Sequence, residues 1–255
     1  IICGGADNAT SAIGMGVLNE GDVQSSIGTS GTILSPTSQP NQDPEMRLHT
    51  FCHCVQDSWY LMGTIISAGS SLRWIRSILS AENISYSKFT NQIESVPIGS
   101  EGLIFLPYLM GERTPHNDAG ARGGFFGLHS SHTSAHMIRA VMEGVCFALK
   151  DSIELITSLG PPFDTIRTTG GGSNNSIWQQ MQSDIFGKTL ALIGPTTGAS
   201  YGAALLGTVG TGVFGTVNEA TKRWLHIKDV IKPDHDNSQL YAKSYDMYRE
   251  LYPAL

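Results

Sequence analysis

Ser26-Ile27-Gly28-Thr29-Ser30-Gly31-Thr32 places a glycine-rich turn between two apolar runs. Glycine permits positive φ, and the hydroxyls of threonine and serine stand beside exposed backbone N–H groups. Such a turn either joins two strands and nothing more, or also holds phosphate oxygens. The stretch therefore predicts a pair of strands over residues 23–34. The candidates for phosphate contact are Gly28, Thr29, Ser30 and Gly31.

A carboxylate precedes this hairpin in the run Ile1-Ile2-Cys3-Gly4-Gly5-Ala6-Asp7. Residues 1–3 read as a short buried strand, and residues 8–18 read as an alanine-rich helix. Asp7 has two compatible interpretations. It caps the helix by accepting backbone N–H bonds, or it acts as a general base that takes a proton from an attacking hydroxyl.

Composition narrows the class of protein. The 255 residues are 40% apolar and 15% charged, with a formal net charge of -6, which is typical of a globular chain. No Lys/Arg cluster occurs, which argues against nucleic acid as a partner. A nucleotide is not excluded, because glycine-rich turns and helix N-termini bind phosphate through backbone N–H groups.

No apolar stretch reaches 18 residues and no signal peptide is visible, so we expect neither a membrane span nor secretion. Cys52-His53-Cys54 lacks a second Cys/His pair at zinc spacing. The cysteines are therefore predicted to be reduced thiols, in a cytoplasmic protein. Because the chain starts with isoleucine on a strand-like run, we expect it to be part of a longer protein.

Alternation of apolar strands and amphipathic helices predicts a single α/β domain over residues 1–255. The expected strands, beyond those above, are residues 51–55, 59–62, 103–107, 165–169 and 189–193. The expected helices are residues 70–79, 135–159, 176–186, 200–213, 217–224 and 236–251. Residues 110–128 read as irregular.

Gly170-Gly171-Gly172 ends one of these strands and opens a helix. Bare backbone there is either a tight turn or a place where a ligand approaches closely. It is not a dinucleotide fingerprint, because Asn175 stands where the third glycine would lie. Nor is Gly187-Lys188-Thr189 the end of a P-loop, since Gln182 replaces the first glycine of that motif.

The segment Gly111-Glu112-Arg113-Thr114-Pro115-His116-Asn117-Asp118 concentrates charge in one irregular stretch. A long charged stretch inside a compact domain is typical of a binding loop or of a solvent-exposed loop that binds nothing. Arg113 either faces phosphate or forms an ion pair with Glu112.

Taken in order, these motifs resemble the C-terminal, ATPase-like domain of the FGGY carbohydrate kinases. The resemblance is carried by Gly4-Gly5-Ala6-Asp7-Asn8-Ala9, by the 26–31 turn and by the 111–118 loop. It extends over residues 67–74, 106–110, 122–128, 139–145, 170–173, 178–187 and 198–204. The matching segments cover nearly the whole chain.

The resemblance implies an actin-like, ribonuclease-H-like fold, in which two domains face each other across a cleft. It implies that Asp7 is the catalytic base and the metal-binding residue, with a magnesium ion expected to accompany ATP. It also implies nucleotide contacts for the 28–31 turn, for Gly69 at the start of a helix, and for Gly171, Gly172 and Asn175 beside the adenosine.

Within the family, residues 112–118 look more like those of xylulose kinases than those of gluconate or glycerol kinases. This implies a pentulose substrate and conversion of D-xylulose to D-xylulose 5-phosphate. The family's N-terminal, sugar-binding domain is not in this sequence, so we expect the chain alone to be inactive on sugar. Other sugars, a non-catalytic nucleotide-binding module and a chaperone- or actin-like ATPase are the competing hypotheses. Two oligomeric states are compatible with the sequence, a monomer and a homodimer.

Overall fold

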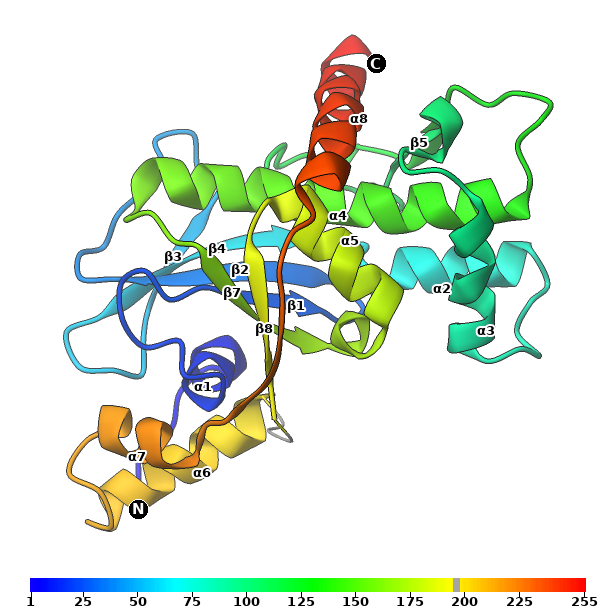
Figure 1. The fold of residues 1–255 in the computed structure, drawn as a ribbon. Coiled ribbons are helices and arrows are strands. Elements are labelled where there is room, and N and C mark those ends of the chain that lie inside the picture. The colour runs from blue at the N-terminus through cyan, green and yellow to red at the C-terminus, as the bar shows by residue number, and fades with distance from the viewer. Residues whose placement is uncertain (195–197) are drawn as a thin grey trace.

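The computed structural model describes residues 1–194 and 198–255 (Figure 1). Within them, seven strands form one mixed sheet. Their order across the sheet is β3 (His49–Cys52), β4 (Trp59–Ile65), β2 (Gly31–Thr37), β1 (Gln24–Ile27), β7 (Thr165–Gly170), β8 (Thr189–Ile193) and β9 (Ile227–Ile231).

The centre of the sheet joins two halves of the chain. β1 and β2 form the predicted hairpin, in which Ile27 pairs with Gly31. On its other side β1 runs parallel to β7, and Ile27 lies opposite Gly170. Because parallel strands end at the same edge of a sheet, this pairing brings the glycine turn after β1 beside the glycine run after β7.

Apolar side chains alternate along the central strands because successive residues point to opposite faces. Ile33 and Leu61 belong to the larger core, which lies between the sheet and α4 (Ser134–Leu159). Leu34 and Met62 belong to a smaller cluster under α1 (Asp7–Gly14) on the other face. Both faces of the sheet are therefore covered, as an α/β fold requires.

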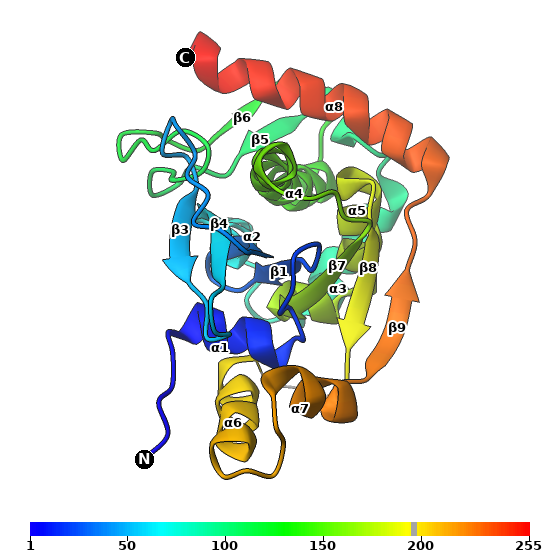
Figure 2. The same ribbon diagram turned by 90° about the vertical axis from the view of Figure 1, so that its left-hand side faces the viewer.

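The helices form layers on the two faces (Figure 2). One face carries α4 with α5 (Ser176–Phe186) and α2 (Gly69–Ile78), while α3 (Tyr86–Asn91) lies beside α2 (Figure 1). On the other face α1 packs against the sheet, with α6 (Gly198–Gly210) and α7 (Val217–Trp224) beyond it. Close approach of α1 and α6 needs glycine at 202, since a Cβ there would lie 1.7 Å from the carbonyl oxygen of Thr10.

An outer layer completes the first face. The C-terminal helix α8 (His235–Ala254) crosses over α4 and α5, next to a small sheet of β5 (Ile104–Leu106) and β6 (Gly124–Phe126) (Figure 2). Tyr241, Tyr245 and Tyr248 lie on one face of α8 at helical spacing, and all three are buried.

The structure confirms most of the predicted elements and corrects others. Residues 1–3 are exposed and form no strand. An isolated apolar run is not a strand unless it can pair with a neighbouring strand. The N-cap of α1 is Ala6 instead of Asp7, and α1 ends at Gly14, earlier than predicted. The sequence pattern does not predict the short elements α3, β6 and β9, nor the 3-10 helices at residues 92–95, 100–102 and 171–174.

Candidate functional site

A cavity of about 400 Å³ opens where β1 and β7 end, at the edge of the sheet between α2, α3 and α5. In open α/β sheets, ligands bind at the carboxyl ends of strands. Six of the residues singled out in the sequence share its lining: Gly28, Thr29, Gly69, Gly171, Gly172 and Asn175. The structure therefore gathers three separate glycine-containing motifs around one space.

The turn after β1 is held against the N-terminus of α2. The Gly28 carbonyl accepts a bond from the N–H of Gly69 at 2.9 Å. The Thr29 carbonyl accepts bonds from the N–H groups of Ala68 and Ser70, each at 3.1 Å, and from the Ser70 hydroxyl at 2.9 Å. The turn thus satisfies N–H groups that a helix start leaves without partners, which fixes its position.

The same turn leaves donors available for a ligand. Among the described residues, the N–H groups of Thr29 and Ser30 have no hydrogen-bond partner, and both residues are exposed. A Cβ on Gly28 or Gly171 would meet no atom closer than 3.7 Å, so neither glycine is required by packing. Bare backbone with free N–H groups suits the oxygens of a phosphate chain.

Two other glycines in the lining are required by packing. A Cβ on Gly69 would lie 2.4 Å from the Gly28 carbonyl oxygen, and one on Gly172 would lie 2.7 Å from the Ile27 side chain. Any larger residue at these positions would force the turn and its neighbours apart.

Asn175 joins the two sides of the cavity. It is the N-cap of α5, and its side-chain oxygen accepts the N–H of Trp178 at 2.8 Å. Its side-chain nitrogen donates to the Thr90 hydroxyl on α3 at 2.7 Å. The Asn175 side chain therefore holds α3 against α5. Both of its polar atoms already form hydrogen bonds within the protein.

The lining also includes residues that the sequence analysis missed: Ile27, Leu72, Arg73, Tyr86, Thr90 and Trp178. Leu72 and Arg73 lie three and four positions after Gly69, one helical turn along α2, which is a spacing the sequence could have revealed. Tyr86 and Thr90 come from α3, which was not predicted. The apolar members form a wall for a flat ring, and the exposed Arg73 adds a positive charge.

Ser30, Gly31 and Asp7 are not part of this lining. Gly31 begins β2, where a Cβ would lie 2.8 Å from the Ile65 side chain, so packing explains this glycine. Asp7 is exposed at the first position of α1, and its carboxylate accepts the N–H of Asn8 at 2.8 Å. Its negative charge contributes to the raised pKa of Tyr60, which is due first to burial.

The 111–118 loop is anchored to the segment between β4 and α2. The Glu112 carboxylate accepts backbone N–H bonds from Ile66 at 2.9 Å and Arg113 at 2.8 Å, while the Arg113 side chain is exposed. The suggested Glu112–Arg113 ion pair is thus replaced by bonds to backbone. Ile66 leads into α2, so Glu112 connects the loop to the segment that carries Gly69.

Glu112 is 1% exposed, and burial raises its pKa to about 7. An acid with a raised pKa in the folded state stabilises the fold fully below its unfolded pKa, and that stabilisation is lost as the pH rises through about 7. Glu112→Gln keeps an oxygen for both backbone donors and carries no charge. We expect this variant to exceed wild type in free energy of unfolding by about 1–3 kcal/mol at pH 8 and to match it near pH 4.5.

Urea unfolding between pH 4.5 and pH 8 measures this difference. Glu250→Gln on the exposed face of α8 makes the same change of charge and serves as the control. If the difference in free energy of unfolding between Glu112→Gln and wild type does not change with pH, the raised pKa of Glu112 is contradicted.

We also searched the described residues for metal sites, for disulfides and for membrane-spanning helices. The described residues contain no group of three or more His, Cys, Asp or Glu side chains arranged to hold a metal ion. All four cysteines are free, and Cys146 is buried while Cys3 and Cys52 are exposed. Among the helices of the described residues, none is both long and apolar enough to cross a membrane.

Comparison with known proteins agrees with this architecture. Residues 23–211 match the model of the C-terminal domain of the FGGY family of carbohydrate kinases. A xylulose kinase of Bacillus subtilis is 39% identical over 252 residues, covering 99% of this chain and 50% of that protein. The chain thus spans about half the length of the curated relatives it matches.

Solved structures agree as well. A ligand-bound xylulose kinase from Lactobacillus acidophilus superimposes with a TM-score of 0.91 at 30% identity, covering 98% of this chain and 50% of that one. A gluconate kinase from the same organism gives 0.90 at 30% identity, with the same coverage. The chain therefore belongs to the FGGY family of carbohydrate kinases and carries its C-terminal domain.

Proposed function

We propose that this chain is the ATP-binding half of a kinase that phosphorylates a sugar, with D-xylulose converted to D-xylulose 5-phosphate. The observation that carries the proposal is the single cavity into which the turn after β1, the start of α2 and the glycine run after β7 all open. The xylulose kinases among its relatives favour a pentulose as the acceptor.

The apolar wall of the cavity suits an adenine ring, and the free N–H groups of Thr29 and Ser30 suit phosphate oxygens. In our proposal Gly28 and Gly171 admit the ligand because they carry no side chain. Asn175 acts through its cap and its bond to Thr90, so its contribution is to hold the walls in place.

Asp7 is proposed as the general base for the acceptor hydroxyl. Its exposed carboxylate at the start of α1 is accessible to a second body of protein that carries the sugar. Mg²⁺ would enter with ATP, held by phosphate oxygens and water with Asp7 as a carboxylate near it, and would neutralise charge during phosphoryl transfer.

Residues 1–255 then act as one nucleotide-binding domain, and the sugar-positioning groups belong to the rest of the kinase. A cytoplasmic location is part of the same proposal. We expect the 255-residue chain to bind ATP and to release no ADP in response to D-xylulose, because groups that orient the acceptor are missing. Substantial xylulose-dependent ADP release by the isolated chain would contradict this division of labour.

Calorimetric titration of the chain with ATP tests the site. We expect Arg73→Ala to weaken ATP binding by about tenfold, because it removes a cation from the lining of the cavity. Arg223→Ala on α7, beyond the opposite face of the sheet, is the matched control and should bind ATP like wild type. Equal affinity of both variants would remove Arg73 from the site, and no binding of ATP by wild type would refute the proposal itself.

Gluconate is the second candidate acceptor, because relatives named gluconokinase and gluconate kinase match nearly as well. Turnover of the whole kinase with D-xylulose, D-ribulose, gluconate and glycerol distinguishes these acceptors. Preference for gluconate by kcat/KM would overturn the choice of a pentulose while leaving the ATP site intact.

A further inference from the structure

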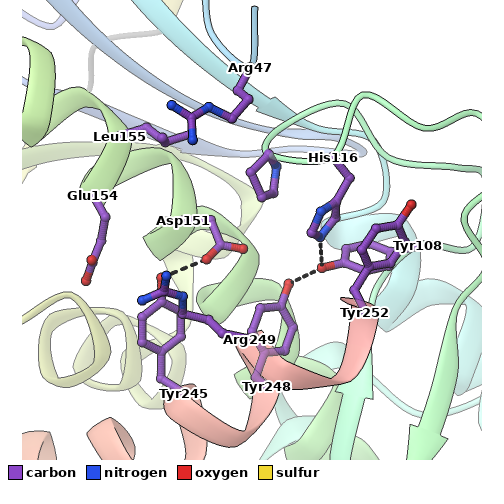
Figure 3. A pocket seen from close by; sticks show the side chains of 11 residues that line it. Arg47, Tyr108, His116, Asp151, Glu154, Leu155, Tyr245, Tyr248, Arg249 and Tyr252 are labelled. Atoms are coloured by element: carbon purple, nitrogen blue, oxygen red, sulfur yellow. Dashed lines mark hydrogen bonds between the residues drawn. The ribbon is translucent and has the colours of Figure 1, made fainter. Parts of the chain in front are cut away.

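A second cavity, of about 310 Å³, lies between α4, α8 and the loop after β5 (Figure 3). It shares no lining residue with the cavity at the ends of β1 and β7. Its lining includes two arginines, two carboxylates, one histidine and four tyrosines. Nothing in the proposed transfer of phosphate to sugar uses these residues.

Asp151 is the buried polar group of this cavity. Only 8% of it is exposed, and the Tyr245 hydroxyl donates to its Oδ1 at 2.7 Å. Its Oδ2 has no hydrogen-bond partner among the described residues, and the side chain points into the cavity (Figure 3). Burial raises the pKa of Asp151 to about 7. Oδ2 can therefore accept a hydrogen bond from a donor that enters the cavity.

A chain of neutral groups forms the opposite wall. The Tyr108 hydroxyl lies 2.7 Å from the Tyr248 hydroxyl and 3.0 Å from His116 Nε2 (Figure 3). His116 stacks on Tyr252 with ring centroids 3.7 Å apart. Burial lowers the pKa of His116 to about 4, so the ring is neutral at pH 7. Its Nδ1 has no partner among the described residues.

The lining carries charged groups of both signs. Arg47 and Arg249 are opposed by Asp151 and Glu154. Arg47 is already engaged by Asp43, at 2.9 Å from Nε and 2.8 Å from Nη2. A ligand with a net charge of either sign would meet like charge on one side of the cavity. A neutral ligand avoids that repulsion.

We propose that this cavity binds a small neutral polyhydroxylated molecule, a polyol or monosaccharide. Each hydroxyl group both donates and accepts, so it can donate to Asp151 or Glu154 and accept from Arg249. The tyrosine rings provide apolar faces for the C–H side of such a molecule. The volume is at the lower end of the range for ligand pockets, which fits a small ligand.

Titration of the 255-residue chain with xylitol tests the proposal, with ADP present at saturation so that the nucleotide cavity is filled. We expect saturable binding in the millimolar range, and no binding of orthophosphate or methylammonium at the same concentrations. Arg249→Ala and Glu154→Ala each change an exposed side chain, so folding should be retained. Each variant should weaken xylitol binding at least fivefold.

Glu250→Ala is the matched control, because Glu250 follows Arg249 on α8 and does not line the cavity. It should bind xylitol within twofold of wild type. Xylitol binding that neither lining variant weakens would place the ligand elsewhere and overturn the proposal. Absence of xylitol binding, or binding of phosphate or methylammonium in its place, would overturn it as well. None of these outcomes bears on ATP binding, which is measured separately.

Discussion

Asp7→Asn in the whole kinase is expected to lower kcat by about 10²–10⁴-fold, which is the usual contribution of a general base. The amide keeps the size of the side chain and can still accept the N–H of Asn8, so α1 should form as before. It cannot take a proton from the acceptor hydroxyl. Because Asp7 does not line the nucleotide cavity, the dissociation constant for ATP should stay within about twofold of wild type.

The comparison requires steady-state turnover with D-xylulose and calorimetric titration with ATP on the same preparations. Asp236→Asn is the matched control, since Asp236 is also an exposed aspartate in the first turn of a helix, α8. It should leave kcat and ATP binding unchanged. Full turnover by Asp7→Asn would remove Asp7 from the role of base. Loss of turnover together with loss of ATP binding would indicate a structural role.

Gly69→Ala is expected to weaken ATP binding at least tenfold and to lower the free energy of unfolding by about 1–3 kcal/mol. The new Cβ would lie 2.4 Å from the Gly28 carbonyl oxygen, a backbone atom that cannot rotate away. The turn and α2 would have to separate, which breaks the bond from Gly69 N–H to that carbonyl. The N–H groups of Thr29 and Ser30 would move with the turn.

Gly207→Ala makes the same substitution in α6, where a Cβ would meet no atom within 4 Å. It should leave ATP binding unchanged and, because alanine favours a helix over glycine, it should stabilise the fold slightly. Chemical unfolding and calorimetric titration of both variants give the two quantities. ATP affinity equal to that of wild type in Gly69→Ala would refute a close contact between the turn, α2 and the nucleotide.

Much of the local structure could be predicted because neighbouring residues decide it. The turn between β1 and β2 follows from its glycines and hydroxyls, and α5 ends where predicted because Gly187 adopts a left-handed conformation, with φ of 62°. The long helix α4 was predicted to within one residue, since its apolar stripe is regular.

The missed elements have a physical explanation. Within the described part of the chain β9 pairs with β8 alone, at the edge of the sheet. Lys228, Asp229 and Val230 on β9 are exposed, so its sequence has no buried pattern. α3 spans six residues, too short for a clear helical period, and its position depends on the bond between Thr90 and Asn175. Tyr86 and Thr90 reach the cavity from α3, so no pattern in the sequence predicts their place in its lining.

By itself, the sequence determined the kind of each major element, the two glycine-rich turns and the family resemblance, because these depend on residue types and their spacing. Only the tertiary structure decided that those turns share one cavity. Ile27 and Gly170 are far apart in the chain, and they meet because β1 and β7 pair in parallel. Local pattern does not specify which strands pair, since pairing depends on packing of the whole chain around the sheet. The same holds for the cavity under α8, whose lining comes from four separate segments.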